Sequence, residues 1–131
     1  MNTLNIIIPE DAPKFTLNGL VVPARVVDVY DGDTCKCVFD FRGNFSKFTC
    51  RIYGIDTPEI RNKDLEDKAR GYKARDALRE VCLNKLVTLT CYNFDKYGRL
   101  LVDFSVQDIS SISKWMIDSG YAKEYYGGHK Q

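Results

Sequence analysis

The chain has 131 residues, and its 19 Lys and Arg against 18 Asp and Glu give a formal net charge of only +1. This length predicts one domain, and a content of 44% hydrophobic and 28% charged residues excludes disorder, collagen and a coiled coil. The near-neutral charge argues at first against a polyanion-binding protein, although net charge does not say where the charges lie.

Three β-strands are predicted in the first half of the chain. Residues 21–29 are rich in β-branched side chains and lead into an Asp-Gly pair, which is a strong turn signal. Residues 34–41 alternate apolar and polar side chains. An Arg-Gly-Asn turn then leads into a third strand over residues 45–53, so that the second and third strands form a hairpin.

A helix and two further strands follow. Apolar side chains recur at helical spacing from Ala74 to Cys82, which predicts an amphipathic helix that ends near Asn84. Residues 85–92 and 100–105 return to strand character. The Asp-Lys-Tyr-Gly sequence between these two strands suits a type I turn.

A short second helix is predicted from Ile109 to Met116, and Gly120 ends it. The order of three strands, helix, two strands and helix predicts a mainly β fold with helices (α+β), namely a five-stranded OB-fold barrel with two packed helices. Residues 1–20 are expected to form an N-terminal arm lying on the barrel, and residues 21–131 the barrel domain.

The N-terminal segment carries no recognisable targeting signal. Its apolar cluster at residues 4–8 is interrupted by Asn5, is too short for the core of a signal peptide and has no basic segment before it. No apolar run approaches the roughly 18 residues that a membrane span requires. We therefore expect an intracellular protein that does not associate with a membrane.

The cysteine and histidine content excludes some kinds of chemistry. The five cysteines are odd in number and lack paired Cys-x-x-Cys knuckles, so we interpret them as buried free thiols rather than as disulfides or zinc ligands. The single histidine, His129, lies two residues from the end of the chain. Its position disfavours reactions that use a histidine base or nucleophile.

Three acidic residues lie in loops beside the predicted strands. Asp33 follows the Asp-Gly turn, and Asp56 and Glu59 lie three residues apart on either side of Thr57-Pro58. Carboxylates and a backbone carbonyl that converge from two loops are the hard oxygen ligands that calcium or magnesium prefers. Acids beside turns also serve as turn formers or helix caps, so spacing alone leaves both interpretations open.

Two arginines strengthen the first interpretation. Arg51 precedes Asp56 in the same strand-loop unit, and Arg99 closes the predicted type I turn. A guanidinium binds phosphate oxygens bidentately, and two of them beside a metal would neutralise the charge of a phosphoryl transition state. The alternative is a pair of surface arginines in weak ion pairs. The residues therefore indicate metal-assisted phosphoryl chemistry.

Three segments in this order resemble the signature motifs of the staphylococcal nuclease (thermonuclease) family. The resemblance spans residues 21–126 and also covers Gly71, expected before the first helix, and the residues from Gly120 to Lys123. The three segments are Val29-Tyr30-Asp31-Gly32-Asp33-Thr34, Arg51 through Asp56-Thr57-Pro58-Glu59, and Asp95-Lys96-Tyr97-Gly98-Arg99.

This resemblance implies an OB barrel and a calcium-dependent nuclease that hydrolyses DNA and RNA and leaves 3′-phosphate products. Asp33 and Asp56 would be the carboxylate ligands of calcium, and Thr57 would supply its backbone carbonyl. Glu59 would be the general base that deprotonates the attacking water.

The resemblance also implies roles for residues that contact the polymer. Arg51 and Arg99 would grip the scissile phosphate and stabilise its transition state. Lys96 and Tyr97 match residues that contact a neighbouring phosphate, and Tyr126 matches a tyrosine beside the sugar and base. Another basic stretch is open to two readings, a phosphate-binding surface or a solvated face: Arg61, Lys63, Lys68, Arg70, Lys73 and Arg75.

Other hypotheses remain open at this level. Family members commonly continue into a third C-terminal helix, which we expect this chain to lack because it stops at Gln131. One alternative is a catalytically silent module that binds nucleic acid or protein, as in the Tudor staphylococcal-nuclease proteins, but such domains typically lose the acids or arginines that this chain keeps. Another is a metal or redox protein that uses the cysteines. We expect DNA and RNA substrates, no obligate protein partner and a monomer.

Overall fold

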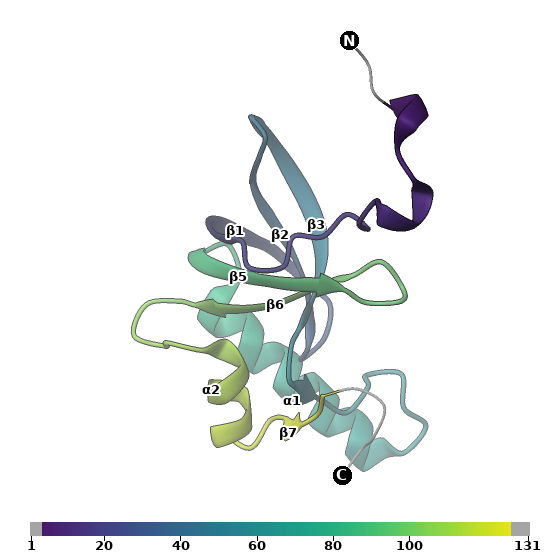
Figure 1. The fold of residues 1–131 in the computed structure, drawn as a ribbon. Coiled ribbons are helices and arrows are strands. Elements are labelled where there is room, and N and C mark those ends of the chain that lie inside the picture. Colours follow the sequence, from purple (N-terminus) through teal and green to yellow (C-terminus); the bar gives the residue numbers. More distant parts are fainter. Residues whose placement is uncertain (1–3, 127–131) are drawn as a thin grey trace.

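A closed five-stranded barrel forms the centre of the molecule (Figure 1). The computed structural model describes residues 4–126. Around the barrel the strands follow the order β1-β2-β3-β6-β5, and neighbours are antiparallel except for the parallel pair β3 and β6. Their bounds are β1 Val21–Val29, β2 Thr34–Phe41, β3 Asn44–Ile52, β5 Leu86–Phe94 and β6 Leu100–Ser105. The predicted OB-fold barrel with two helices is confirmed.

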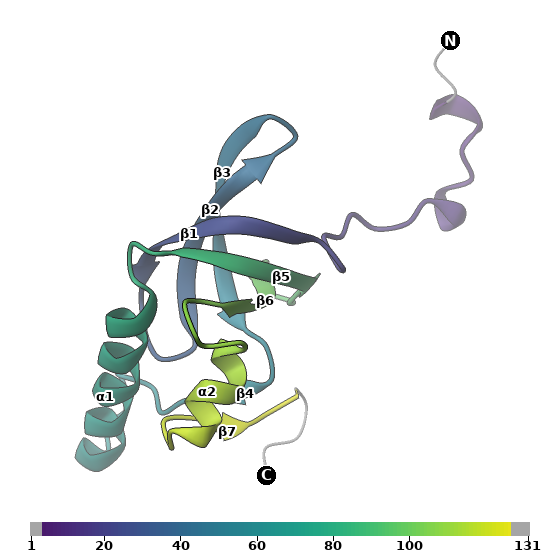
Figure 2. The ribbon, with the colours of Figure 1, turned by 90° about the vertical axis from the view of Figure 1, so that its left-hand side faces the viewer.

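The β2–β3 hairpin extends beyond the barrel (Figure 2). Its two-residue turn, Arg42 and Gly43, has positive φ angles of 54° and 88°, as a tight hairpin connection requires. The carboxylate of Asp40 accepts a hydrogen bond from the backbone N–H of Gly43 at 2.9 Å. All five predicted strands are confirmed, and their bounds differ from the prediction by at most two residues.

Alternate side chains of the strands fill the barrel, as the period-two pattern predicts. Phe39 and Phe104 are the largest of these side chains, and both are almost fully buried. All five cysteines are free and buried, which confirms their interpretation as buried thiols. No group of three or more His, Cys, Asp or Glu among residues 4–126 is placed to hold a metal ion.

Helix α1 (Leu65–Cys82) begins nine residues before Ala74, where its apolar pattern starts. The carboxylate of Asp64 caps it by accepting hydrogen bonds from the backbone N–H groups of Glu66 and Asp67 at 2.9 and 3.1 Å. Gly71 therefore lies inside this helix, and its expected position before the helix is wrong. The first half of the helix was missed because it is highly charged and carries no apolar stripe.

Helix α2 (Ile112–Asp118) begins after Ser111, whose hydroxyl accepts a hydrogen bond from the Lys114 N–H at 3.2 Å. Ile109 lies before the helix and forms an isolated β-bridge with Val106, so the predicted start at Ile109 is wrong. A second, two-stranded sheet joins β4 (Ile55–Asp56) to β7 (Lys123–Glu124). The sequence did not predict these strands, because two residues carry no periodicity.

The described segment before β1 packs against the barrel near its end. Leu17 is buried, and the Phe15 ring lies 6.0 Å from that of Phe41. Residues 4–16 are exposed, include two short 3-10 turns (Leu4–Ile6 and Pro9–Asp11), and extend away from the barrel in Figures 1 and 2. Neither helix of the described chain has the length and apolarity that crossing a membrane would require.

Candidate active site

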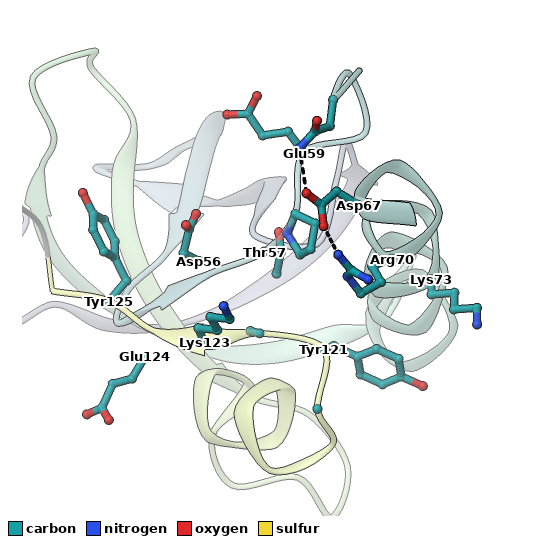
Figure 3. A pocket seen from close by; sticks show the side chains of 14 residues that line it. Asp56, Thr57, Glu59, Asp67, Arg70, Lys73, Tyr121, Lys123, Glu124 and Tyr125 are labelled. Atoms are coloured by element: carbon teal, nitrogen blue, oxygen red, sulfur yellow. Dashed lines mark hydrogen bonds and ion pairs between the residues drawn. The ribbon is translucent and has the colours of Figure 1, made fainter. Parts of the chain in front are cut away.

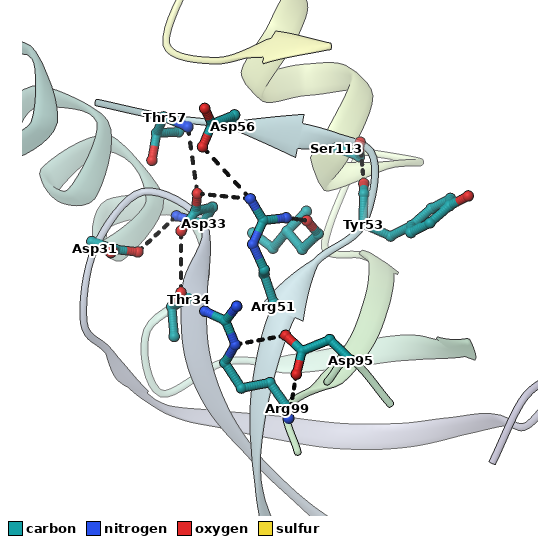
Figure 4. A network of polar contacts seen from close by, with 11 residues as sticks. Asp31, Asp33, Thr34, Arg51, Tyr53, Asp56, Thr57, Asp95, Arg99 and Ser113 are labelled. Carbon is teal, nitrogen blue, oxygen red and sulfur yellow. Dashed lines mark hydrogen bonds and ion pairs between the residues drawn. The ribbon is translucent and has the colours of Figure 1, made fainter. Parts of the chain in front are cut away.

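Loops at one end of the barrel enclose a cleft of about 380 Å³. They are the β1–β2 loop, the segment after β4 and the β5–β6 turn, and the end of β3 contributes one arginine (Figure 4). The cleft brings together Asp33, Arg51, Asp56, Glu59 and Arg99, which are five of the six predicted metal and catalytic residues. Its other lining residues are Tyr30, Asp31, Thr34, Ile60, Arg61 and Tyr125.

Asp33 and Asp56 share one arginine. A terminal nitrogen of Arg51 lies 3.5 Å from Asp33 Oδ2 and 3.6 Å from Asp56 Oδ1. The same Asp33 oxygen accepts the backbone N–H of Thr57 at 3.4 Å, and Asp33 Oδ1 accepts the Thr34 hydroxyl at 3.1 Å. Two loops distant in sequence therefore converge on Asp33, which places the three predicted metal ligands next to one another.

Burial changes the acidity of Asp33. Removal of its carboxylate from water, together with a neighbouring negative charge on Asp31, raises the pKa of Asp33 to about 6, while the Arg51 guanidinium opposes this rise. Burial of a carboxylate is costly unless a positive charge compensates it. Asp33 is therefore a buried acid that a cation would stabilise in its ionised form.

Both arginines line the cleft, and each is held by its own contacts (Figure 4). Arg51 donates to the Ile52 carbonyl at 3.3 Å, and its guanidinium carbon lies 5.7 Å from the centre of the Tyr125 ring. Arg99 donates through Nε to Asp95 Oδ2 at 2.7 Å. Because this ion pair uses Nε, the planar end of Arg99 keeps its two terminal nitrogens for a second acceptor.

Asp95 orients both the β5–β6 turn and the side chain of Arg99. Its Oδ1 accepts the backbone N–H groups of Tyr97 at 2.8 Å and of Arg99 at 2.9 Å. Burial alone would raise the pKa of Asp95, but these hydrogen bonds and the Arg99 charge hold it below its usual value. The sequence identified Asp95 only as a turn residue, and its position four residues before Arg99 was the available signal.

Helix α1 braces the loop that carries Glu59, which is exposed and lines the cleft. A Cβ atom at Gly71 would lie 2.6 Å from the Pro58 carbonyl oxygen, so only glycine lets the helix approach the loop this closely. A Cβ atom at Gly32 would lie 2.7 Å from Ala74 Cβ and 2.9 Å from a methyl carbon of Thr57. These two glycines therefore let both loops that carry the predicted metal ligands pack closely against the helix.

A larger cavity of about 640 Å³ lies beside this cleft and shares Asp56, Glu59 and Tyr125 with it (Figure 3). Helix α1 and the segment from Gly120 to Tyr125 form its sides. Lys123 extends into it from β7 in Figure 3. Neither Arg51 nor Arg99 lines this cavity, whereas both line the smaller cleft.

The predicted substrate-binding residues lie outside the cleft lining. Lys96 and Tyr97 are exposed on the β5–β6 turn, and the Lys96 ammonium lies 5.2 Å from the centre of the Tyr97 ring. Tyr126 packs against Tyr53, with their ring centres 5.5 Å apart. The sequence reasoning missed Tyr125, which lines the cleft and lies over Arg51.

The donor set fits calcium. The proposed donors are the carboxylates of Asp33 and Asp56, from separate loops, and the backbone carbonyl of Thr57, whose N–H donates to Asp33. All are hard oxygen donors, and Asp33 is buried.

The barrel and its polar cleft define an OB-fold protein with a candidate site for phosphoryl chemistry. A sequence profile described as "Staphylococcal nuclease homologue" matches residues 49–131, and the chain belongs to that family. The matched range begins after Asp33 and includes Arg51, Glu59 and Arg99.

Two relatives extend this comparison. The chain is similar to an "Uncharacterized endonuclease" of Escherichia coli O157:H7, with 32% identity over 104 residues, which cover 79% of this chain and 61% of the relative. It is also similar to an uncharacterised protein of Bacillus anthracis, with 35% identity over 118 residues, which cover 87% of this chain and 52% of that protein. The chain therefore spans between half and two thirds of the length of these relatives.

Proposed function

We propose that the protein is a calcium-dependent nuclease that hydrolyses phosphodiester bonds of DNA and RNA and leaves 3′-phosphate products. The observation that carries this proposal is the presence of two arginines, Arg51 and Arg99, in the cleft that also contains Asp33 and Asp56. Family membership and the name of the Escherichia coli relative, which calls that protein an endonuclease, support the same class of activity.

Calcium would be held by the carboxylates of Asp33 and Asp56 and the backbone carbonyl of Thr57. When bound, it would supply a positive charge that polarises the phosphodiester and favours attack at phosphorus. The same charge would favour the ionised form of Asp33, whose pKa is raised by burial.

Glu59 is the proposed general base. It accepts a proton from a water molecule as the water oxygen bonds to phosphorus, and the bond from phosphorus to the 5′-oxygen breaks. The leaving 5′-oxygen takes a proton from solvent, Glu59 returns its own proton to solvent, and the phosphate remains on the 3′-oxygen. Because Glu59 is exposed on the wall of the cleft, it is accessible to both water and substrate.

Arg51 and Arg99 have a different role, which is electrostatic. Negative charge builds up on the equatorial oxygens of phosphorus during the reaction, and positioned guanidinium groups stabilise that charge more than the ground state. Tyr125 and Asp95 hold these two side chains in place. Arg99 also lies on the turn that carries Lys96 and Tyr97, the residues proposed to contact a neighbouring phosphate.

We further propose an intracellular, monomeric enzyme with no obligate protein partner, in which Tyr126 contacts the sugar or base. A catalytically silent module is the competing hypothesis. The carboxylates of Asp33 and Asp56 beside Arg51 and Arg99 argue for catalysis. A module that only bound nucleic acid would not need two buried or half-buried carboxylates beside its arginines.

The decisive experiment is cleavage of a single-stranded DNA oligonucleotide, and of its RNA counterpart, in EGTA and then with added calcium. We expect cleavage only with calcium, with 3′-phosphate ends. Asp56→Asn should abolish the calcium response, whereas Asp108→Asn, at an exposed carboxylate, should leave it intact. Cleavage in EGTA would overturn the calcium mechanism, and binding without cleavage would support the silent module.

A further inference from the structure

The cavity of about 640 Å³ beside the cleft has cationic side chains in its lining that the proposed mechanism does not use. Arg70 and Lys73 lie about one turn apart on α1, and Lys123 lies on β7. All three residues are exposed. In Figure 3, Arg70 extends from α1 toward the cavity, whereas Lys73 extends outward at its edge. We call this space the second cavity, and its volume is usual for a ligand site.

Acidic side chains also line the second cavity, and most of them have a role or a partner of their own. Asp56 and Glu59 also line the cleft, where the mechanism assigns them to calcium and to water. Oδ1 of Asp67 contacts a terminal nitrogen of Arg70, and its Oδ2 accepts a hydrogen bond from the Asn62 amide at 3.5 Å. A guanidinium carries five N–H donors, so Arg70 retains donors for a phosphate.

The pairing of β4 with β7 places Lys123 beside a proposed metal ligand. Lys123 is the partner of Asp56 in this antiparallel pair. Side chains directly opposite each other in such a pair lie on the same face, so the Lys123 side chain shares the face of Asp56. The next residue, Glu124, projects to the opposite face and extends away from Lys123 in Figure 3. The end of β7 is tied down by the Tyr125 N–H, which donates to the Gly54 carbonyl at 2.9 Å.

The second cavity continues the cleft on the side away from the β5–β6 turn. Asp56, Glu59 and Tyr125 line both spaces and form their common wall. Arg99, on the β5–β6 turn, lines only the cleft. A strand whose scissile phosphate lies at Arg99 therefore extends past that turn in one direction and across the common wall into the second cavity in the other.

The basic stretch of the sequence divides into two groups in the structure. Arg61 lines the cleft, and Arg70 and Lys73 line the second cavity. The members that line neither space are Lys63, Lys68 and Arg75. Only the first group is therefore placed to meet a polymer that occupies these two spaces.

We propose that the second cavity binds the backbone of the nucleic-acid strand beyond the scissile phosphate, and that Arg70 and Lys123 each contact a phosphate there. This inference rests on the proposed nuclease function and extends the substrate site to a run of nucleotides. OB folds bind single strands over about 4–16 nucleotides, so contacts outside the cleft are expected. Phosphate contacts carry no sequence information, so the second cavity adds affinity without sequence preference.

The salt dependence of binding counts these contacts. The probe is a single DNA strand of about eight nucleotides, within the range that OB folds bind, and EGTA keeps it intact. For single strands, the logarithm of the binding constant falls with the logarithm of salt concentration by about 0.7 for each neutralised phosphate. Arg70→Ala and Lys123→Ala should each reduce this slope by about 0.7. Arg70→Lys and Lys123→Arg keep the charge and should retain the wild-type slope.

Matched controls separate a contact in the second cavity from the loss of a surface charge. Lys68→Ala removes a charge from the same helix as Arg70, at a position that does not line the cavity. Lys114→Ala, at an exposed position on α2, is the control for Lys123. Both control variants should keep the wild-type slope. Thermal denaturation verifies the fold of each variant.

An unchanged slope in Arg70→Ala or in Lys123→Ala would overturn the proposal. An equal reduction in the control variants would also overturn it, because the effect would then come from the field of the whole protein. Failure of the nuclease proposal has a different signature, namely a wild-type protein that does not cleave with calcium, whatever the salt dependence of its binding.

Discussion

A terminal nitrogen of Arg51 lies 3.5 Å from a carboxylate oxygen of Asp33, and both side chains are largely buried. The proposed mechanism requires Arg51 to bind phosphate and Asp33 to bind calcium, so each group has a second partner within the protein. Phosphate therefore competes with Asp33 for the guanidinium. The pair also links the charge of Asp33 to the stability of the fold.

Replacement of Asp33 by Asn should stabilise the calcium-free protein at neutral pH. Burial raises the pKa of Asp33 from 3.8 to about 6, so the folded protein holds this proton more tightly than the unfolded chain does. The free energy of unfolding must then fall as the pH rises from about 4 to about 6. The loss is at most about 3 kcal/mol, at about 1.4 kcal/mol per pKa unit. Asn has no charge to desolvate and avoids this loss.

Urea denaturation in calcium-free buffer at about pH 4 and at about pH 7 checks this expectation. Asp33→Asn should be more stable than the wild-type protein only at the higher pH, and Asp108→Asn provides an exposed control. A variant that is less stable than the wild-type protein at about pH 7 would show that the ion pair with Arg51 outweighs the cost of burial.

Arg99→Lys should lower kcat by about 100-fold or more while substrate binding weakens only modestly, because lysine keeps the charge but loses the planar fork. The Asp95 contact through Nε is also lost, which removes the group that orients Arg99. Steady-state kinetics on the DNA oligonucleotide measure both parameters. Arg25→Lys, at an exposed position on β1, is the matched control, and turnover equal to that of the control would remove Arg99 from the catalytic set.

Glu59→Gln should lower kcat by about two to four orders of magnitude, the usual contribution of a general base, with substrate affinity preserved. Glutamine has nearly the same shape but cannot accept the proton of water. The measurement compares single-turnover cleavage with oligonucleotide binding in EGTA. Glu80→Gln, on the exposed part of α1, controls for loss of a surface charge. If binding and cleavage fell in parallel, Glu59 would have a role in binding instead.

Gly71→Ala should destabilise the protein and reduce kcat together. In an open helix position this change would be stabilising by up to about 1 kcal/mol, because alanine has the higher helix propensity. Here the new Cβ would lie 2.6 Å from the Pro58 carbonyl oxygen, and the loop that carries Glu59 must move away. Thermal denaturation and kinetics check both effects.

Ala69→Gly, at an exposed position on the same helix, isolates the propensity effect. It should lower the melting temperature slightly and leave kcat unchanged. A higher melting temperature for Gly71→Ala with normal kcat would mean that the helix does not brace the loop.

The sequence predicted the strands well, because their signals are local. Alternation along residues 34–41 reports which face of β2 is buried, and the turn residues report where the hairpins lie. The start of α1 was missed for the opposite reason. Its first half presents charged residues and Gly71, and that glycine is explained only by the Pro58 backbone of a distant loop.

The residues of the candidate site also fall into two groups, those that local sequence motifs identify and those that they do not. Asp33, Arg51, Asp56 and Arg99 were identified from the sequence by motifs at the ends of strands, and barrel closure brings them to one cleft. Asp95 and Tyr125, which hold the two arginines, were not identified as site residues. Their roles depend on side-chain contacts across separate segments, which no local pattern encodes.

Residue types and their order by themselves determined a small barrel with acids and arginines in its loops. Only the tertiary structure decided that Arg51 pairs with both carboxylates, that Asp33 is buried enough to raise its pKa, and that Arg70 and Lys123 line one cavity beside the cleft. Sequence patterns report the environment of a residue along its own strand or helix. The pairing, burial and pKa of a side chain depend on which other segments of the chain approach it. The distances between those segments are set only when the barrel closes.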